Sequence, residues 1–293
     1  MGRYFLHEAT LTLGSLFSGI GGIEIAAEWA GFMTVFQVEI DSYASAVLKK
    51  HWPDVPRWED IQDVRADDIF RITGTKRGQL TVLSGGFPCQ PHSLAGQRKA
   101  SADDRDLWPE YRRLICNLEP RWVVAENVRG LLSSDDGRFF GGILRDLARL
   151  GYDACWCLYR AADVGAVHSR ERVFTIAHSI SEPVFDVVKR NTIGCWKENE
   201  EKRCEDKFAF ELSYGEVAPA EWREPGGPSR PLFFGKANGV PNWLDRHRCL
   251  GNAVVPHQIY PIFKTIAEIE QNLITRNDSD LIPDKPETYF KVD

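Results

Sequence analysis

Long apolar runs are absent from the sequence, and their absence argues against a protein with transmembrane helices. No stretch reaches the roughly 18 to 20 uncharged apolar residues that a bilayer-spanning helix needs. The opening residues, MGRYFLHEATLT, also lack the long apolar segment of a secretory signal. With 43% hydrophobic and 27% charged residues, the chain has the composition of an ordinary globular protein. We therefore expect a cytoplasmic protein without a membrane partner.

Cysteine pairs with metal-binding spacing are also lacking. The seven cysteines form an odd-numbered and irregular set in which no CxxC pair occurs. Cys155 and Cys157 come closest, but they alternate as residues of a strand would, so we expect reduced thiols and no metal site. Cys89 is unusual because it lies in a proline-containing loop sequence, GGFPCQPHS. It is either a small apolar residue that happens to lie in a loop or an accessible thiol that takes part in a reaction.

An excess of basic residues is missing as well. The formal net charge is −6 at pH 7. Nucleic-acid binding depends on Lys and Arg at phosphates, so this charge argues weakly against a nucleic-acid partner. A local basic face is still compatible with the overall charge.

Alternating strand and helix patterns fill roughly the first 175 residues. In the helix that starts near residue 21, the spacing of Ile23, Ala26, Ala27 and Ala30 forms one apolar face, and Gly31 is a suitable stop. The alternation predicts an α/β fold with a mostly parallel, twisted sheet flanked by helices. The predicted strands are 11–17, 34–40, 80–86, 121–128, 154–161 and 172–179, and the predicted helices are 21–32, 42–52, 110–118 and 142–152.

The periodic pattern breaks near residue 180. Residues 180–249 are rich in charge, proline, glycine and tryptophan, and an amphipathic helical pattern resumes only over 251–271. We therefore predict a main domain formed by 1–179 and 250–275, interrupted by a small region over 180–249. Residues 276–293 are predicted to be a flexible C-terminal tail.

A glycine-rich turn, FSGIGGIE, joins the first predicted strand to the first predicted helix. Turns of this kind let a ligand approach the backbone and the helix N-terminus, but they are also common without any ligand. Glu39 follows Gly19 by twenty residues at the end of the second strand, where a carboxylate accepts hydrogen bonds from ribose hydroxyls. The sixth position of the GxGxxG pattern is not glycine, which argues against a plain NAD site.

Several short motifs follow one another along the chain: FSGIGG, VEID, EDI, GGFPCQPHS, AENV, HSRERVF and GNAVVP. Taken alone, AENV could be a hydrated strand end, and HSRER could be a solvated turn. In this order the set resembles the cytosine-5 DNA methyltransferase family over roughly 11–178 and 250–270. The resemblance implies a Rossmann-like methyltransferase fold that uses S-adenosylmethionine, with 180–249 as a small target-recognition region.

The resemblance also implies a set of catalytic residues. Cys89 would be the nucleophile that adds to C6 of cytosine, which makes C5 reactive toward the methyl group. Glu126 would hold a proton against cytosine N3, Arg172 would contact O2, and Arg170 would support the site. The partner would be double-stranded DNA with the target cytosine flipped out of the stack.

The same resemblance implies the residues that would bind S-adenosylmethionine. The adenine would contact Phe17, Ile40, Asp60 and Ile61, and the ribose would contact Glu39. The backbone at Gly19, Gly21 and Gly22 would face the methionine part. The remaining residues assigned to this pocket are Pro88, Leu107, Asn252 and Ala253.

This sequence departs from the family pattern at three places. His168 stands where glutamine is usual, and His92 stands where an aromatic residue is usual. The motif that normally precedes the terminal glycine-asparagine motif is absent, and NGVPNWLDRHRC occupies its place, as in short phage or prophage members.

Two alternatives to DNA methylation stay open from the sequence. One is a cytosine-5 methyltransferase acting on transfer RNA, and the other is an inactive relative that only binds DNA or cofactor. For the DNA enzyme we expect a monomer, with a cognate restriction endonuclease encoded separately.

Overall fold

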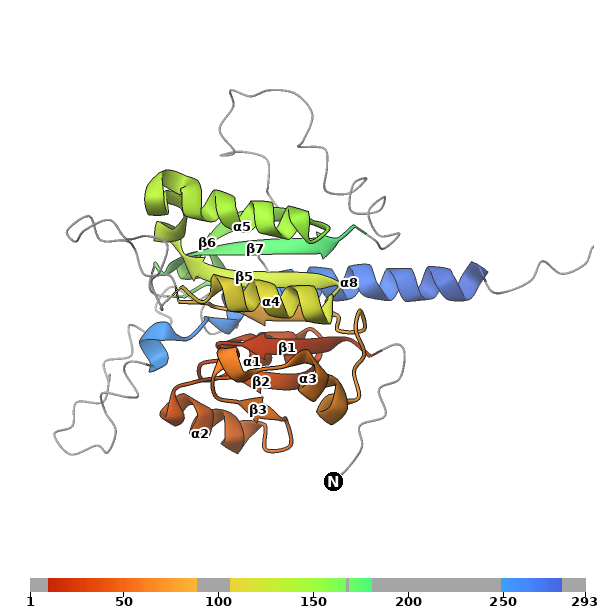
Figure 1. Ribbon diagram of the computed structural model, residues 1–293. Coiled ribbons are helices and arrows are strands. Elements are labelled where there is room, and N and C mark those ends of the chain that lie inside the picture. Colours follow the sequence, from red (N-terminus) through yellow and green to blue (C-terminus); the bar gives the residue numbers. More distant parts are fainter. Residues whose placement is uncertain (1–9, 89–105, 167–168, 181–248, 281–293) are drawn as a thin grey trace, which may run out of the picture.

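The computed structural model describes residues 10–88, 106–166, 169–180 and 249–280, which form one seven-stranded sheet with helices on both faces (Figure 1). The strands are β1 (Thr12–Leu16), β2 (Met33–Val38), β3 (Arg57–Trp58), β4 (Val82–Gly85), β5 (Trp122–Val128), β6 (Tyr152–Arg160) and β7 (Glu171–Ser179). The α-helices are α1 (Gly22–Trp29), α2 (Ser42–His51), α3 (Ala66–Thr73), α4 (Trp108–Leu118), α5 (Arg138–Arg149) and α8 (Pro256–Asp280). Three 3-10 helices complete the described elements: η1 (Ile61–Asp63), η2 (Arg129–Gly137) and η3 (Ala161–Val164).

The strand order is β3-β2-β1-β4-β5-β7-β6. All adjacent strands pair in parallel except β7, which is antiparallel to both β5 and β6. This arrangement confirms the predicted mostly parallel α/β sheet. The order reverses between β1 and β4, and in sheets of this type ligands bind outside the carboxyl ends of the strands at such a reversal.

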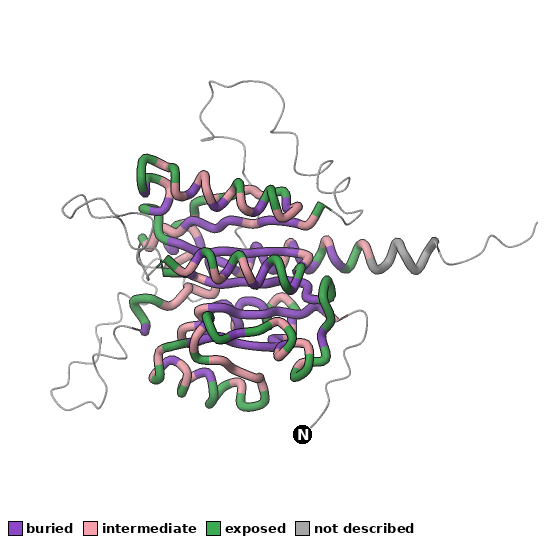
Figure 2. Tube along the Cα trace, viewed as in Figure 1, coloured by how far each residue is buried: buried purple, intermediate pink, exposed green. Residues whose placement is uncertain are grey.

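Each face of the sheet has its own apolar core, because side chains alternate along buried strands. In β5, Trp122 and Val124 face the core formed with α1 and α8, whereas Val123 and Ala125 face the core formed with α4 and α5. Figure 2 shows the central strands as mainly buried, between helices with mixed exposure.

Helix α8 lies on the same face of the sheet as α1, although the two are far apart in sequence. Glu270 of α8 is fully buried and accepts a hydrogen bond at Oε1 from Trp122 Nε1 at 2.7 Å. It also forms an ion pair with Arg121. These contacts tie the last helix to the start of β5.

The helix boundaries differ most from the sequence prediction at α5 and α8. Helix α5 spans Arg138–Arg149 and not the predicted 142–152, because its buried face already begins at Phe140. Helix α8 begins at Pro256 and not at residue 251, because proline suits the first helical position, where its missing N–H is not needed. Residues 249–252 form a separate helical turn before it. Helix α3, which has only eight residues, was not among the predicted helices; Ile69 is its one buried residue.

The predicted region 180–249 and the tail from 276 onward lie mostly outside the described residues, so the domain boundaries stay a prediction. Among the residues that the structure describes, no helix combines the length and apolarity needed to cross a membrane.

Burial raises the pKa of the Cys155 thiol to about 11 and that of the Cys157 thiol to about 12. Both thiols therefore stay protonated at neutral pH, which is unfavourable for metal binding or nucleophilic attack.

Candidate active site

The glycine-rich turn after β1 lies at the carboxyl edge of the sheet, next to the strand-order reversal. Gly19 and Gly21 have φ values of +56° and +94°, and the Gly21 N–H donates to the Ser18 carbonyl at 3.0 Å. Phe17 also has a positive φ, of +52°, which is uncommon for a residue with a side chain. The turn is therefore a tight and partly strained backbone structure at the place where a ligand is expected.

Gly22 brings the C-terminal segment against this turn. A Cβ added at Gly22 would lie only 2.1 Å from the carbonyl oxygen of Val254, so only glycine allows the two backbones to approach this closely. Asn252 and Ala253 directly precede Val254. The structure thus places two predicted cofactor residues beside the glycine-rich turn, although they lie about 230 residues further along the chain.

Glu39 follows β2 and points toward the same turn. Its Oε2 accepts a hydrogen bond from the Gly19 N–H at 2.6 Å, and its Oε1 accepts one from the Asp41 N–H at 2.7 Å. These two backbone N–H groups fix the direction of the carboxylate. The role of Glu39 at a ribose stays a prediction.

The other predicted cofactor residues surround this edge with different degrees of exposure. Ile40 is 71% exposed, so its apolar side chain is accessible to a ligand. The Asp60 carboxylate accepts from the Gln62 N–H at 2.9 Å, whereas the Ile61 side chain is buried in the core. Phe17 and Leu107 pack partly against that core, and Pro88 is exposed.

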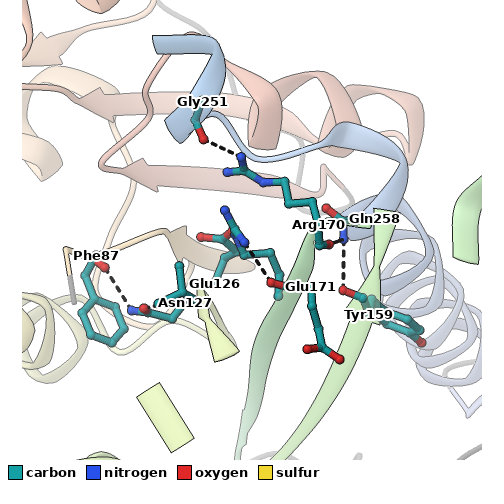
Figure 3. A network of polar contacts seen from close by, with 10 residues as sticks. Phe87, Glu126, Asn127, Tyr159, Arg170, Glu171, Gly251 and Gln258 are labelled. Atoms are coloured by element: carbon teal, nitrogen blue, oxygen red, sulfur yellow. Dashed lines mark hydrogen bonds and ion pairs between the residues drawn. The ribbon is translucent and has the colours of Figure 1, made fainter. Parts of the chain in front are cut away.

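A buried group of charges lies at the carboxyl end of β5. The Nε of Arg172, in β7, lies 2.9 Å from Oε1 of Glu126, and both side chains are largely buried. Arg170 also lies close enough to act electrostatically on Glu126. The structure therefore brings together three of the four predicted catalytic residues, of which Figure 3 labels Glu126 and Arg170.

Burial raises the pKa of Glu126 above its usual range. The positive charges of Arg172 and Arg170, and a hydrogen bond from Arg172, act in the opposite direction but do not cancel the desolvation. Glu126 consequently keeps a proton to higher pH than an exposed glutamate. Such a carboxyl group can donate a proton or a hydrogen bond in a buried site.

Two further residues connect this charged group to the residues that directly precede Cys89. The Asn127 side chain donates from Nδ2 to the Phe87 carbonyl at 3.0 Å and accepts from the Val128 N–H at 2.9 Å (Figure 3). A Cβ added at Gly86 would lie 2.9 Å from Oε2 of Glu126. The residues just before Cys89 are therefore in direct contact with the end of β5.

Cys89, His92 and His168 lie outside the described residues, so their predicted roles stay predictions. Sequence reasoning missed the contacts of Gly86, Asn127 and Gln258. For the first two, the motif letters GGFPC and AENV marked the right segments but not the contact between them.

The sequence that forms this sheet and site matches a known protein family. The model of the C-5 cytosine-specific DNA methylase family matches residues 11–209, which is more than half of the chain. This chain belongs to the C-5 cytosine-specific DNA methylase family. The match confirms the resemblance inferred from the motifs.

Named members of the family are similar over part of their length. The type II methyltransferase M.NgoMIV from Neisseria gonorrhoeae is 36% identical over 160 residues, covering 55% of this chain and 49% of the relative. M.Sau96I from Staphylococcus aureus is 34% identical over 164 residues, covering 55% of this chain and 37% of the relative. The chain thus matches about a third to a half of the length of these curated relatives.

A solved structure supports the methyltransferase fold. It is an E. coli protein described as a DNA modification methyltransferase encoded within a prophage, and it is 28% identical to this chain. The two structures superpose with a TM-score of 0.51 over 59% of this chain and 47% of the other. The Rossmann-like methyltransferase fold predicted from the sequence is therefore confirmed.

Proposed function

We propose that the chain is a DNA cytosine-5 methyltransferase that methylates a cytosine flipped out of duplex DNA. The observation that carries this proposal is the buried Glu126–Arg172 pair, which lies beside the residues that lead into the Cys89 loop. A carboxyl group with a raised pKa and a guanidinium group are the partners that the N3 and O2 edges of cytosine require. Membership of the cytosine-5 methylase family supports the same reaction.

The residues at the turn after β1 fit S-adenosylmethionine as the methyl donor. Glu39 offers a carboxylate held by two backbone N–H groups, and Ile40 offers an exposed apolar surface beside it. When bound, the cofactor supplies an electrophilic methyl group. Because Gly22 has no side chain, Asn252 and Ala253 can lie beside the same turn and contribute to the proposed cofactor site.

The base side of the site performs the rest of the chemistry in this proposal. The Cys89 thiolate would form a bond to C6 while Glu126 protonates N3, so that C5 becomes electron-rich; the cofactor would supply the electrophilic methyl group to C5, with its sulfur as the leaving group. A base would then remove the C5 proton, the thiolate would leave as the C5–C6 double bond forms again, and N3 would return its proton to Glu126. Arg172 holds O2 and, through its ion pair, the orientation of Glu126.

Sequence recognition belongs to residues 180–249 in this proposal. Their Arg and Lys side chains would contact guanines, and the short length suggests a target of about four to six base pairs. We further propose that the protein acts as a monomer and that a separate gene encodes a cognate endonuclease.

Methyl transfer from labelled S-adenosylmethionine tests the function directly. We expect the wild-type protein to label duplex DNA and not transfer RNA, and we expect Cys89→Ala to label neither. Bisulfite sequencing of DNA from cells that express the protein should then give the target. Preferential labelling of transfer RNA would contradict the DNA substrate, and cofactor binding without any transfer would identify an inactive relative.

A further inference from the structure

Gln258, in the first turn of α8, is fully buried and lies outside the predicted catalytic and cofactor residues. Its Nε2 donates to the carbonyl oxygen of Tyr159 at 3.0 Å and to that of Arg170 at 2.7 Å (Figure 3). These two bonds use both protons of the amide. Tyr159 is near the end of β6, and Arg170 directly precedes β7, so Gln258 bridges the two strands where they meet η3.

Two residues of the C-terminal segment form hydrogen bonds with Arg170, one with its backbone carbonyl and the other with its side chain. Besides the bond from Gln258 to the Arg170 carbonyl, the guanidinium Nη1 of Arg170 donates to the carbonyl oxygen of Gly251. Gly251 directly precedes Asn252, one of the residues beside the glycine-rich turn. Arg170 therefore connects the cofactor side of the site to the start of β7.

The start of β7 in turn fixes Arg172. Arg170 and Arg172 are two residues apart, and Tyr159 of β6 is the register partner of Arg172. Holding the carbonyls of Tyr159 and Arg170 therefore fixes the backbone that presents Arg172 to Glu126. A shift of this backbone would change the 2.9 Å contact between Arg172 and Glu126.

Packing alone does not explain an amide at this position. Among the described residues, the Oε1 of Gln258 is buried without a hydrogen-bond partner, which is unfavourable in a core. An apolar side chain of similar volume would fill the same space without this disadvantage. The two donated hydrogen bonds are thus the feature that distinguishes glutamine here.

We propose that Gln258 is a positioning residue that couples the segment around Asn252 to the Glu126–Arg172 pair. Binding on the cofactor side then favours the arrangement that the base side needs, and binding of DNA favours the cofactor side by the same factor. The inference rests on the proposed function, because it assigns the two sides to cofactor and to cytosine.

The test compares Gln258→Met with a control in the same helix, Ile266→Ala. Methionine keeps most of the volume but removes both donors, whereas Ile266 is buried two helical turns further on and has no side-chain group that could donate a hydrogen bond to either carbonyl. One measurement is kcat on duplex DNA that the wild-type protein methylates. The other is the affinity for S-adenosylhomocysteine, the demethylated product, by calorimetry with and without that DNA.

We expect Gln258→Met to lower kcat between about 10- and 100-fold, the usual consequence of a small misplacement of catalytic groups. The affinity for S-adenosylhomocysteine without DNA should stay unchanged, but its increase on adding DNA should disappear. Ile266→Ala should lose stability and keep both the kcat and the effect of DNA. If Gln258→Met does not fold, Gln258→Asn decides, because its shorter amide reaches only one carbonyl and should lower kcat to a smaller extent.

Wild-type values of kcat and of the DNA effect in the foldable Gln258 variant would overturn the inference while leaving the proposed function intact. An equal loss in Ile266→Ala would overturn it as well, since general destabilisation would then be the cause. A wild-type protein that methylates no DNA would overturn the proposed function together with the inference.

Discussion

Glu39 and Glu126 stand at the ends of two strands of one sheet, on the cofactor side and the base side of the candidate site. They are almost equally buried, with exposures of 8% and 7%. Glu39 accepts hydrogen bonds from two backbone N–H groups, at Gly19 and Asp41. Glu126 instead faces the guanidinium of Arg172, and burial raises its pKa.

This difference shows how environment separates two glutamates of similar burial. Backbone N–H donors stabilise the ionised form and fix its direction, which suits an acceptor for ligand hydroxyls. Desolvation that the nearby arginines do not cancel favours the protonated form, which suits a proton donor.

Removing the Glu126 carboxyl should have the largest effect. We expect Glu126→Ala to lower kcat by about 10² to 10⁴, the range typical for loss of a general acid or base. Its affinity for S-adenosylmethionine should stay unchanged, because Glu39 and the turn after β1 are intact. Single-turnover kinetics with calorimetry would check both; weaker cofactor binding with normal chemistry would reverse the assigned roles.

The same change on the cofactor side should give the opposite pattern. Glu39→Ala should weaken S-adenosylmethionine binding by about 1 to 3 kcal/mol, because ribose hydroxyls would lose their acceptor. At saturating cofactor, kcat should return close to the wild-type value. Calorimetry without DNA measures the affinity, and Glu39→Gln is a useful companion because it keeps an acceptor oxygen.

A single methyl group at Gly86 should disturb the base side alone. In Gly86→Ala the new Cβ would lie 2.9 Å from Oε2 of Glu126, so the carboxyl group must move. We expect kcat to fall by about tenfold, with the cofactor affinity retained. Gly141→Ala in α5 is the matched control, because its Cβ would meet nothing within 4 Å, and it should leave kcat unchanged.

The pH dependence should give the smallest but most specific signal. Because the pKa of Glu126 is raised, the protonated form persists above the usual range, and kcat should fall as pH rises through this raised pKa. Glu126→Gln should lack this decrease, although its kcat should be lower throughout. Rates at saturating DNA and cofactor across the stable pH range would show it; a decrease that persists in Glu126→Gln must come from another group.

Much of the fold could be predicted from local sequence patterns. The apolar run in RWVVAENV predicted β5, and the spacing of Ile23, Ala26 and Ala27 predicted the buried face of α1. The position of β7 between β5 and β6 could not be predicted, because strand neighbours depend on packing and not on the strand's own sequence. Proline at 256 explains why α8 begins later than the periodicity alone indicates.

Residues of the candidate site could be predicted only where they lie within the family motifs. The motifs identified Glu39 and Glu126, but not the hydrogen bonds that distinguish them. Glu24 shows the limit: it is fully buried in α1 and accepts a hydrogen bond from Gln37 Nε2 at 3.0 Å, although a charged residue would be expected in solvent. Such contacts join residues from different elements, so no local pattern specifies them.

The packing of α8 beside α1 also affects how the chain folds during synthesis. The core on this face contains Ile23 and Phe174, but it is completed only by α8 residues such as Phe263. Roughly 90 residues separate β7 from the middle of α8, and at about 5 to 20 residues per second the ribosome needs about 5 to 20 seconds to add them. During this time α1 packs on this face of the sheet without α8 beside it. The nascent chain is then most exposed to aggregation, and a chaperone that binds apolar surfaces would protect it until α8 emerges.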